Sequence, residues 1–194
     1  MFELMYPPEP ALVYPRPSYR GTQIALTGEM LPLVDVHGIV TGRACRSWCH
    51  GPERPLHPVV HLHLLSRSGE IYLQKRSETK DLLPGYWDTA VGGHVTYGEQ
   101  LEEALMREAG EELGLFDFNP LYLKTYVWES KSERELVNVF AAVGHFRPEP
   151  DRDEVSEGRF WSFDEVDKTL GLHVLTPNFE HEYSQIRPIL QALL

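Results

Sequence analysis

The most regular pattern of apolar and polar residues lies between residues 96 and 114. Its apolar residues recur every three or four positions, the spacing of a helix that buries one stripe. They are Leu101, Ala104, Leu105, Ala109 and Leu113. Thr96 and Glu99 have the spacing of a capping box, and Gly114 can adopt the left-handed conformation that ends a helix. The pattern therefore predicts a helix that Thr96 caps and Gly114 ends.

Shorter patterns predict strands on both sides of this helix. Runs of apolar and β-branched residues bounded by turn residues are typical of strands. They cover residues 33–44, with a turn at Gly38, and residues 59–66, 70–77, 89–94, 121–129, 135–146 and 159–163. Residues 59–66 and 70–77 form a predicted hairpin, in which the alternation places His61 and His63 on the exposed side.

The C-terminal part of the chain carries two more helix signals. Ser162 and Glu165 form a second capping box, which predicts a short helix that ends near Gly171. Thr176–Pro177 predicts the start of the last helix, and Pro188 is expected to kink or interrupt it. Strands around one central helix, followed by C-terminal helices, indicate an α/β layered domain with a mixed sheet.

Residues 1–32 differ from the rest because they carry six of the fifteen prolines and show no clear period. We expect an extended arm there, packed on the domain or partly mobile, and a single domain over residues 33–194.

Charge and cysteine content narrow the classes of function. The 194 residues include 29 acidic and 18 basic ones, a formal net charge of −11, which argues against nucleic-acid polymers and anionic membranes as partners. No apolar run reaches the length of a membrane span and no signal peptide is evident, so we expect a cytoplasmic protein. Cys45 and Cys49 indicate no disulfide framework. With His50 they spell C-x3-C-H, but no second pair completes a soft-metal site, so free thiols are favoured.

The predicted helix is unusually acidic on its polar side. Between residues 99 and 112 it carries six glutamates and one basic residue, Arg107. Like charges four residues apart cost a helix about 0.2–0.5 kcal/mol per pair, and Arg107 can offset part of this by pairing with Glu103 and Glu111. Glu108, Glu111 and Glu112 would then share one face. Their carboxylates are hard oxygen ligands, which predicts a Mg²⁺ or Mn²⁺ site.

The same segment resembles the Nudix box of the Nudix hydrolase superfamily. Gly93, Glu99 and the run REAGEELGL at residues 107–115 match every fixed position of that box. The resemblance implies an α/β/α sandwich with a mixed sheet and a metal-dependent hydrolase.

Residues outside the box are similar to the isopentenyl-diphosphate isomerase branch of this superfamily. The similarity runs from VDVHGIVTG to CHGPERPLH and includes ERELVNVF. It implies a second metal site with mixed imidazole and carboxylate ligands, formed by His50, His57, His94, Glu133 and Glu135. A purely structural role for the three histidines stays open beside it.

Arg76 and Lys80 stand where that branch binds the diphosphate of its substrate. Arg suits bidentate contact with phosphate and Lys supplies a point charge, although both residues also fit ordinary surface positions. Gly92 stands where the isomerases carry a catalytic cysteine. Glycine cannot move a proton to an alkene, so isomerisation would lose one of its two acid–base groups.

The hypothesis from the sequence is a hydrolase that cleaves a diphosphate linkage in a nucleoside diphosphate-X or related small substrate, with Mg²⁺ or Mn²⁺. Its assigned metal ligands are Glu108, Glu111 and Glu112. Arg107 would orient them, and Gly92-Gly93 would let the backbone approach the site closely. The general base is Glu111 or Glu135, and the sequence does not choose between them.

Two other interpretations stay open. One is an isopentenyl-diphosphate isomerase, which Gly92 disfavours, and the other is a non-catalytic module that senses a ligand, which the intact box glutamates disfavour. No motif identifies the group attached to the diphosphate. A homodimer, to which the arm could contribute, is also left open.

Overall fold

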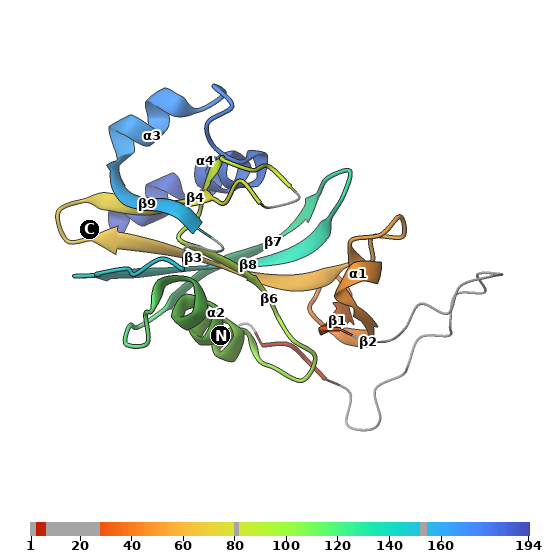
Figure 1. Ribbon diagram of the computed structural model, residues 1–194. Coiled ribbons are helices and arrows are strands. Elements are labelled where there is room, and N and C mark those ends of the chain that lie inside the picture. Colours follow the sequence, from red (N-terminus) through yellow and green to blue (C-terminus); the bar gives the residue numbers. More distant parts are fainter. Residues whose placement is uncertain (1–2, 7–27, 80–81, 152–154) are drawn as a thin grey trace.

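The computed structural model of the protein describes residues 3–6, 28–79, 82–151 and 155–194 (Figure 1). Its strands are β1 (Met30–Val34), β2 (Val40–Cys45), β3 (His57–Ser66), β4 (Glu70–Arg76), β5 (Trp87–Asp88), β6 (Val91–His94), β7 (Leu121–Glu129), β8 (Arg134–Gly144) and β9 (Val155–Ser162). Its helices are α1 (Arg46–Cys49), α2 (Leu101–Leu113), α3 (Phe163–Thr169) and α4 (Pro177–Ala192).

The main sheet is mixed, as the sequence predicted. Its strands follow the order β5-β4-β3-β8-β7, with β6 paired to β3 and β9 paired to β4, and only β3 and β8 run parallel. Helix α2 lies on one face of the sheet, while α3 and α4 lie on the other (Figure 1). The expected α/β/α architecture is therefore confirmed.

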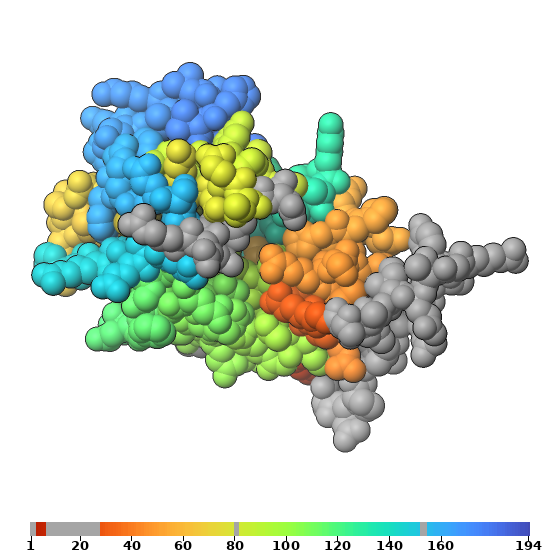
Figure 2. All heavy atoms as spheres, in the orientation of Figure 1, coloured from red at the N-terminus to blue at the C-terminus, as the bar shows by residue number. Residues whose placement is uncertain are grey.

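Strand β3 pairs with two different antiparallel strands along its length. Near Leu65 it pairs with β4, whereas Val59–Leu62 pair with β6. The β1–β2 hairpin forms a separate small sheet (orange in Figure 2). The strands β4 and β6 thus share one edge of β3, and both contact the C-terminal half of α2, through Gln74–Glu112 and Arg107–His94.

Helix α2 buries the apolar stripe that the sequence predicted. Leu101 and Ala104 belong to a core shared with β3, and the other stripe residues are also buried there. The predicted start is wrong, because the helix begins at Leu101 and is capped by Gln100. Glu103 accepts a hydrogen bond from the Gln100 N–H at 2.8 Å, so the capping box lies four residues later than expected.

The residues first assigned to the cap form a separate turn before the helix. Glu99 accepts a hydrogen bond from the Thr96 N–H at 2.9 Å, and Gly98 supplies a positive φ of 96°. At the other end Gly114 has a φ of 65°, which confirms the predicted left-handed stop.

His61 and His63 are buried, so their predicted exposure is wrong. They lie on a central strand with neighbours on both edges and α4 on one face, where both side chains contact the fully buried carboxylate of Glu182. The distances are 3.0 Å from His61 Nδ1 to Glu182 Oε2 and 2.6 Å from His63 Nε2 to Glu182 Oε1. Tyr126 on β7 donates to the same Oε2 at 2.8 Å.

The C-terminal helices follow their predicted caps. Ser162 caps α3 and Thr176 caps α4, each accepting a hydrogen bond from the backbone N–H three residues ahead. The expected interruption at Pro188 is wrong, since α4 continues to Ala192. Burial of Ile186 and Leu190 on either side of the proline keeps this last turn against the sheet.

The described part of the predicted arm packs on the domain. Leu4 is buried, and the Tyr6 hydroxyl donates to the Glu99 carbonyl at 2.8 Å. Strand β1 begins at Met30, inside the predicted arm, so the boundary at residue 32 stays a prediction. The predicted mobility of the arm concerns mainly residues 7–27, which lie outside the described residues. No helix among the described residues is long and apolar enough to cross a membrane.

The His61–Glu182 pair links the stability of the fold to pH. Burial by itself lowers the pKa of His61, but the charge of Glu182 and its hydrogen bond outweigh this and raise the pKa to about 9. Burial likewise raises the pKa of Glu182, yet His61 and His63 bring it well below its ordinary value. The pair is therefore ionised at neutral pH.

We predict that the free energy of unfolding falls as pH rises. A folded pKa above the unfolded value of about 6.5 stabilises the protein fully below pH 6.5, and this stabilisation is lost as pH rises through about 9. Urea unfolding across this range should show the decline in the wild type and a shallower one in His61→Gln. Parallel pH profiles for both proteins would contradict the assignment.

Candidate functional site

Arg107 holds several parts of the acidic helix together. Its guanidinium donates to Glu99 at 2.9 Å, to Glu108 at 2.8 Å and to Glu111 at 3.1 Å. It also donates to the His94 carbonyl at 3.0 Å, which ties α2 to the end of β6. The predicted pairing with Glu111 is confirmed. The predicted pairing with Glu103 is wrong, because that carboxylate caps the helix through the Gln100 N–H.

The three box glutamates assigned to a metal lie in different surroundings. Glu111 is exposed, with 62% of its side chain accessible, whereas Glu112 is buried. Glu112 accepts a hydrogen bond from the Gln74 side-chain amide at 2.9 Å, a contact to β4 that sequence reasoning missed. Glu108 is mostly buried, and burial raises the pKa of its carboxyl although Arg107 opposes this. The three carboxylates share one region of α2 without forming a closed set of ligands.

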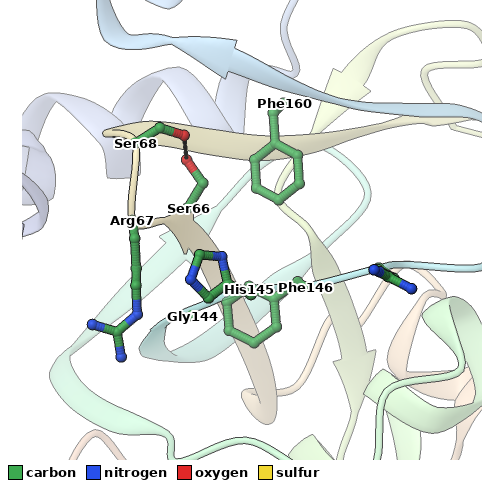
Figure 3. Close-up of a pocket in the computed structure, with 8 residues that line it drawn as sticks. Ser66, Arg67, Ser68, Gly144, His145, Phe146 and Phe160 are labelled. Atoms are coloured by element: carbon green, nitrogen blue, oxygen red, sulfur yellow. Dashed lines mark hydrogen bonds between the residues drawn. The ribbon is translucent and has the colours of Figure 1, made fainter.

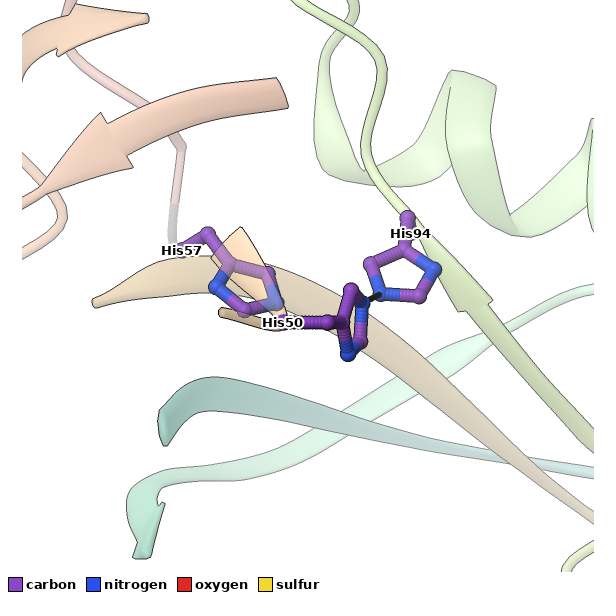
Figure 4. A group of neighbouring side chains, drawn as sticks. All are labelled: His50, His57 and His94. Atoms are coloured by element: carbon purple, nitrogen blue, oxygen red, sulfur yellow. Dashed lines mark hydrogen bonds between the residues drawn. The ribbon is translucent and has the colours of Figure 1, made fainter. Parts of the chain in front are cut away.

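His50, His57 and His94 do converge, as the resemblance implied (Figure 4). Among the described residues they form a group whose ligand atoms all lie within 4.8 Å of one another. The Nε2 atoms of His50 and His94 are 3.0 Å apart. Their elements are the end of α1, the start of β3 and the end of β6. Cys45 and Cys49 are free and buried and do not belong to this group.

The His57 ring is oriented as a metal-binding histidine would be. Its Nδ1 donates to the Pro55 carbonyl at 2.9 Å, so Nε2 carries the lone pair of the neutral ring. That Nε2 is buried and has no hydrogen-bond partner among the described residues. Metal-bound histidines commonly fix one nitrogen on a carbonyl in this way. Burial lowers the pKa of His57 to about 4 and also depresses those of His50 and His94, which keeps the rings neutral.

Two carboxylates on β8 border the histidine group. Glu133 Oε1 lies 3.8 Å from His50 Nδ1, and Glu135 stands opposite His57 in the β3–β8 pairing. Burial, reinforced by the nearby charge of Glu133, raises the pKa of Glu135 to about 8. The two carboxylates thus border the histidine group, but they do not belong to the set whose ligand atoms all lie within 4.8 Å of one another.

Strand β6 separates the two sets of candidate ligands. A Cβ on Gly93 would overlap the Glu108 side chain, while one on Gly92 would meet His61 and Thr89. Neighbouring residues of a strand face opposite sides. The box glutamates therefore lie on the α2 side of β6, and the histidine group and Glu135 lie on the α4 side.

Of the two predicted diphosphate contacts, only Arg76 lies in the described residues. It contacts Asp88 at 3.5 Å and the Leu82 carbonyl at 3.1 Å. Lys80 lies outside the described residues, so its role stays a prediction.

A hollow of about 550 Å³ lies elsewhere on the molecule (Figure 3). Its lining includes Ser66, Gly144 and His145, at the ends of β3 and β8 farthest from His57 and Glu135. None of the predicted site residues lines it. The hollow is therefore separate from the candidate site.

Comparison with known proteins places these features in a family. A model of the NUDIX domain matches residues 55–180. An isopentenyl-diphosphate Delta-isomerase of Photorhabdus laumondii is 30% identical over 139 residues, 68% of this chain and 79% of that protein. The uncharacterized Nudix hydrolase YfcD of Escherichia coli K12 is 38% identical over 101 residues, 52% of this chain and 56% of that protein.

The fold has a close counterpart among solved structures. The crystal structure of DR0079 from Deinococcus radiodurans aligns with a TM-score of 0.70 at 23% identity, covering 81% of this chain and 98% of that one. The family match spans the sheet, α2 with its glutamates and the start of α4. The chain belongs to the Nudix hydrolase family.

Proposed function

We propose that the protein hydrolyses a diphosphate linkage in a nucleoside diphosphate-X or related small substrate, using Mg²⁺ or Mn²⁺. The observation that carries this proposal is the cluster of box carboxylates that Arg107 holds beside the glycines of β6. An acidic face kept in order by one guanidinium suits a dication better than it suits solvation alone.

The carboxylates of Glu108, Glu111 and Glu112 supply the hard oxygens that such an ion prefers. Arg107 occupies one oxygen of Glu108 and one of Glu111, which leaves the other oxygen of each for a ligand role. Glu111 is exposed enough to turn toward Glu108. A divalent cation bound there would lower the pKa of water and neutralise charge on the phosphates.

The histidine group supports a second ion on the other side of β6. The unpartnered, buried Nε2 of His57 and the nearby nitrogens of His50 and His94 fit a metal better than they fit a hydrogen-bonded core. Glu133 and Glu135 would complete a mixed nitrogen and oxygen set.

Substrate binding would use the basic and glycine residues next to these sites. Arg76, held by Asp88, would contact the diphosphate, together with Lys80. Gly92 is exposed and has no side chain to keep a phosphate from the backbone of β6, whereas Gly93 would contribute by leaving room for the Glu108 carboxylate.

Either of two carboxylates would accept the proton of the attacking water. Glu111 is the exposed candidate on α2. Glu135 has a pKa of about 8, close to the value at which a general base works efficiently at neutral pH, but it lies on the α4 side of β6. We favour Glu111 for a reaction centred on the box carboxylates, since it shares their side of the strand.

A substrate screen separates this function from its rivals. Nucleotide sugars, dinucleotides, nucleoside triphosphates and isopentenyl diphosphate would be incubated with Mg²⁺, and the products identified by mass and by phosphate release. Hydrolysis of a diphosphate bond supports the proposal. Formation of dimethylallyl diphosphate would support an isomerase, and tight binding of a compound without turnover would support a ligand-sensing module.

We predict that Glu112→Gln lowers metal-dependent turnover by about 100-fold or more, because it removes a charged ligand while keeping the shape of the side chain. Glu102→Gln is the matched control, since Glu102 is exposed on the same helix and lies outside the ligand set. Turnover is measured on the best substrate of the screen, with folding checked by circular dichroism. Equal activity in both variants would remove Glu112 from the mechanism.

We also predict that His57→Gln binds one Mn²⁺ ion fewer per chain than the wild type. The substitution replaces the imidazole whose lone pair faces the other two rings. Calorimetric titration with Mn²⁺ measures the stoichiometry, with exposed His145→Gln as control. Because His57 is buried, His50→Gln at a partly exposed position is measured as well. Unchanged stoichiometry in both would leave the histidines a structural role.

A further inference from the structure

The imidazole of His61 has one nitrogen held by the protein and one without a protein partner. Nδ1 lies 3.0 Å from Glu182 Oε2, and Glu182 is itself fixed by Tyr126 and His63. Strands β3 and β7 and helix α4 thus set the orientation of the ring. Among the described residues nothing hydrogen-bonds to His61 Nε2, yet this atom is absent from the buried polar atoms that lack a partner. Nε2 therefore keeps a small exposed surface, although only 10% of the His61 side chain is accessible.

Because residue 92 is an exposed glycine, no side chain at that position covers the Nε2 edge of the His61 ring, a gap that we call the opening at Gly92. Gly92 is exposed, and a Cβ built there would lie 3.6 Å from Cδ2 and 3.8 Å from Nε2 of His61. Any side chain at this position would stand over the free edge of the ring. Gly92 does not need to be glycine for backbone reasons, since it is absent from the residues with positive φ.

The charge of the ring decides what Nε2 can do. A neutral imidazole that donates from Nδ1 would present a lone pair at Nε2 and could act as a base. The Glu182 carboxylate favours the protonated ring, in which Nε2 carries a hydrogen and donates. Asp88, whose charge also acts on His61, is paired with Arg76 at 3.5 Å. The opening at Gly92 therefore presents the protonated His61 ring as a fixed cationic donor, and the guanidinium of Arg76 is a second cationic donor near it.

We propose that His61 contacts the substrate directly, donating from Nε2 to a phosphoryl oxygen that enters the opening at Gly92. This assignment rests on the proposed function, because that function supplies the phosphoryl ligand. It makes Glu182 and Tyr126 positioning residues that act through His61. It also assigns a role to the glycine at position 92, because the lack of a side chain there leaves Nε2 of His61 free to contact the ligand.

The probe for the test is methylenediphosphonate, a diphosphate analogue that cannot be hydrolysed at its bridge. Calorimetric titration in the presence of Mg²⁺ should give binding about tenfold weaker, or more, for His61→Gln, because a charge-assisted hydrogen bond is lost. Gly92→Ala should also weaken binding, since its methyl group covers Nε2 without removing any polar group. His145→Gln, in the distant hollow, is the control. Wild-type affinity in both His61→Gln and Gly92→Ala would overturn the proposal.

A second measurement uses the unmodified protein and so does not depend on how the variants fold. In ¹⁵N-labelled protein the His61 Nε2 resonance should shift when the probe is added, whereas that of the fully buried His63 should not. Absence of a His61 shift in protein that binds the probe would overturn the assignment.

Turnover on the screened substrates is measured in parallel to separate the two proposals. Intact turnover with no effect at His61 would overturn only the present inference. A wild-type protein that neither turns over the substrates nor binds the probe would overturn the proposed function together with it.

Discussion

The acidic helix of this protein depends on one guanidinium. Arg107 donates to three glutamates of one helix and its preceding turn, and to the backbone carbonyl of His94. Without it, like charges would repel along α2, and the end of β6 would lose a connection to the helix. Because Arg107 uses only some of the carboxylate oxygens, it can order the glutamates and still leave atoms for a ligand. The contacts of Arg107 thus both fix the positions of the glutamates and leave some of their oxygens available to bind a ligand.

The second constraint is the glycine pair of β6. Gly93 leaves room for the Glu108 side chain on the α2 side, and on the α4 side Gly92 places no side chain over the Nε2 edge of the buried His61 ring. Two adjacent positions therefore shape two different surfaces of one strand. Strand β3 pairs with β6 and then with β4 along the same edge, so the topology of the sheet and the residues of the candidate site meet at β6.

The buried group around Glu182 connects the C-terminal helix to this region. Glu182 is completely buried and is acceptable there because two imidazoles and a phenol satisfy its oxygens. Such a group is costly to leave half-satisfied, so it fixes how α4 sits on the sheet. Its outer member, His61, faces Gly92, so the same contacts that hold α4 on the sheet also orient the His61 ring toward that glycine.

The sequence by itself determined the mixed α/β architecture, the buried stripe of α2, the stop at Gly114 and the meeting of His50, His57 and His94. The architecture, the stripe and the stop rest on local periodicity and turn chemistry, whereas the meeting of the three histidines was implied only by the resemblance to the isomerase branch. Only the tertiary structure decided that His61 and His63 are buried, because strand alternation cannot say whether a strand is central or at an edge. The contacts of Glu112 with Gln74 and of Glu182 with His61 join residues 38 and 121 positions apart, and no local pattern encodes them. Packing of distant segments, rather than their individual propensities, therefore decided which side of β6 each candidate ligand occupies.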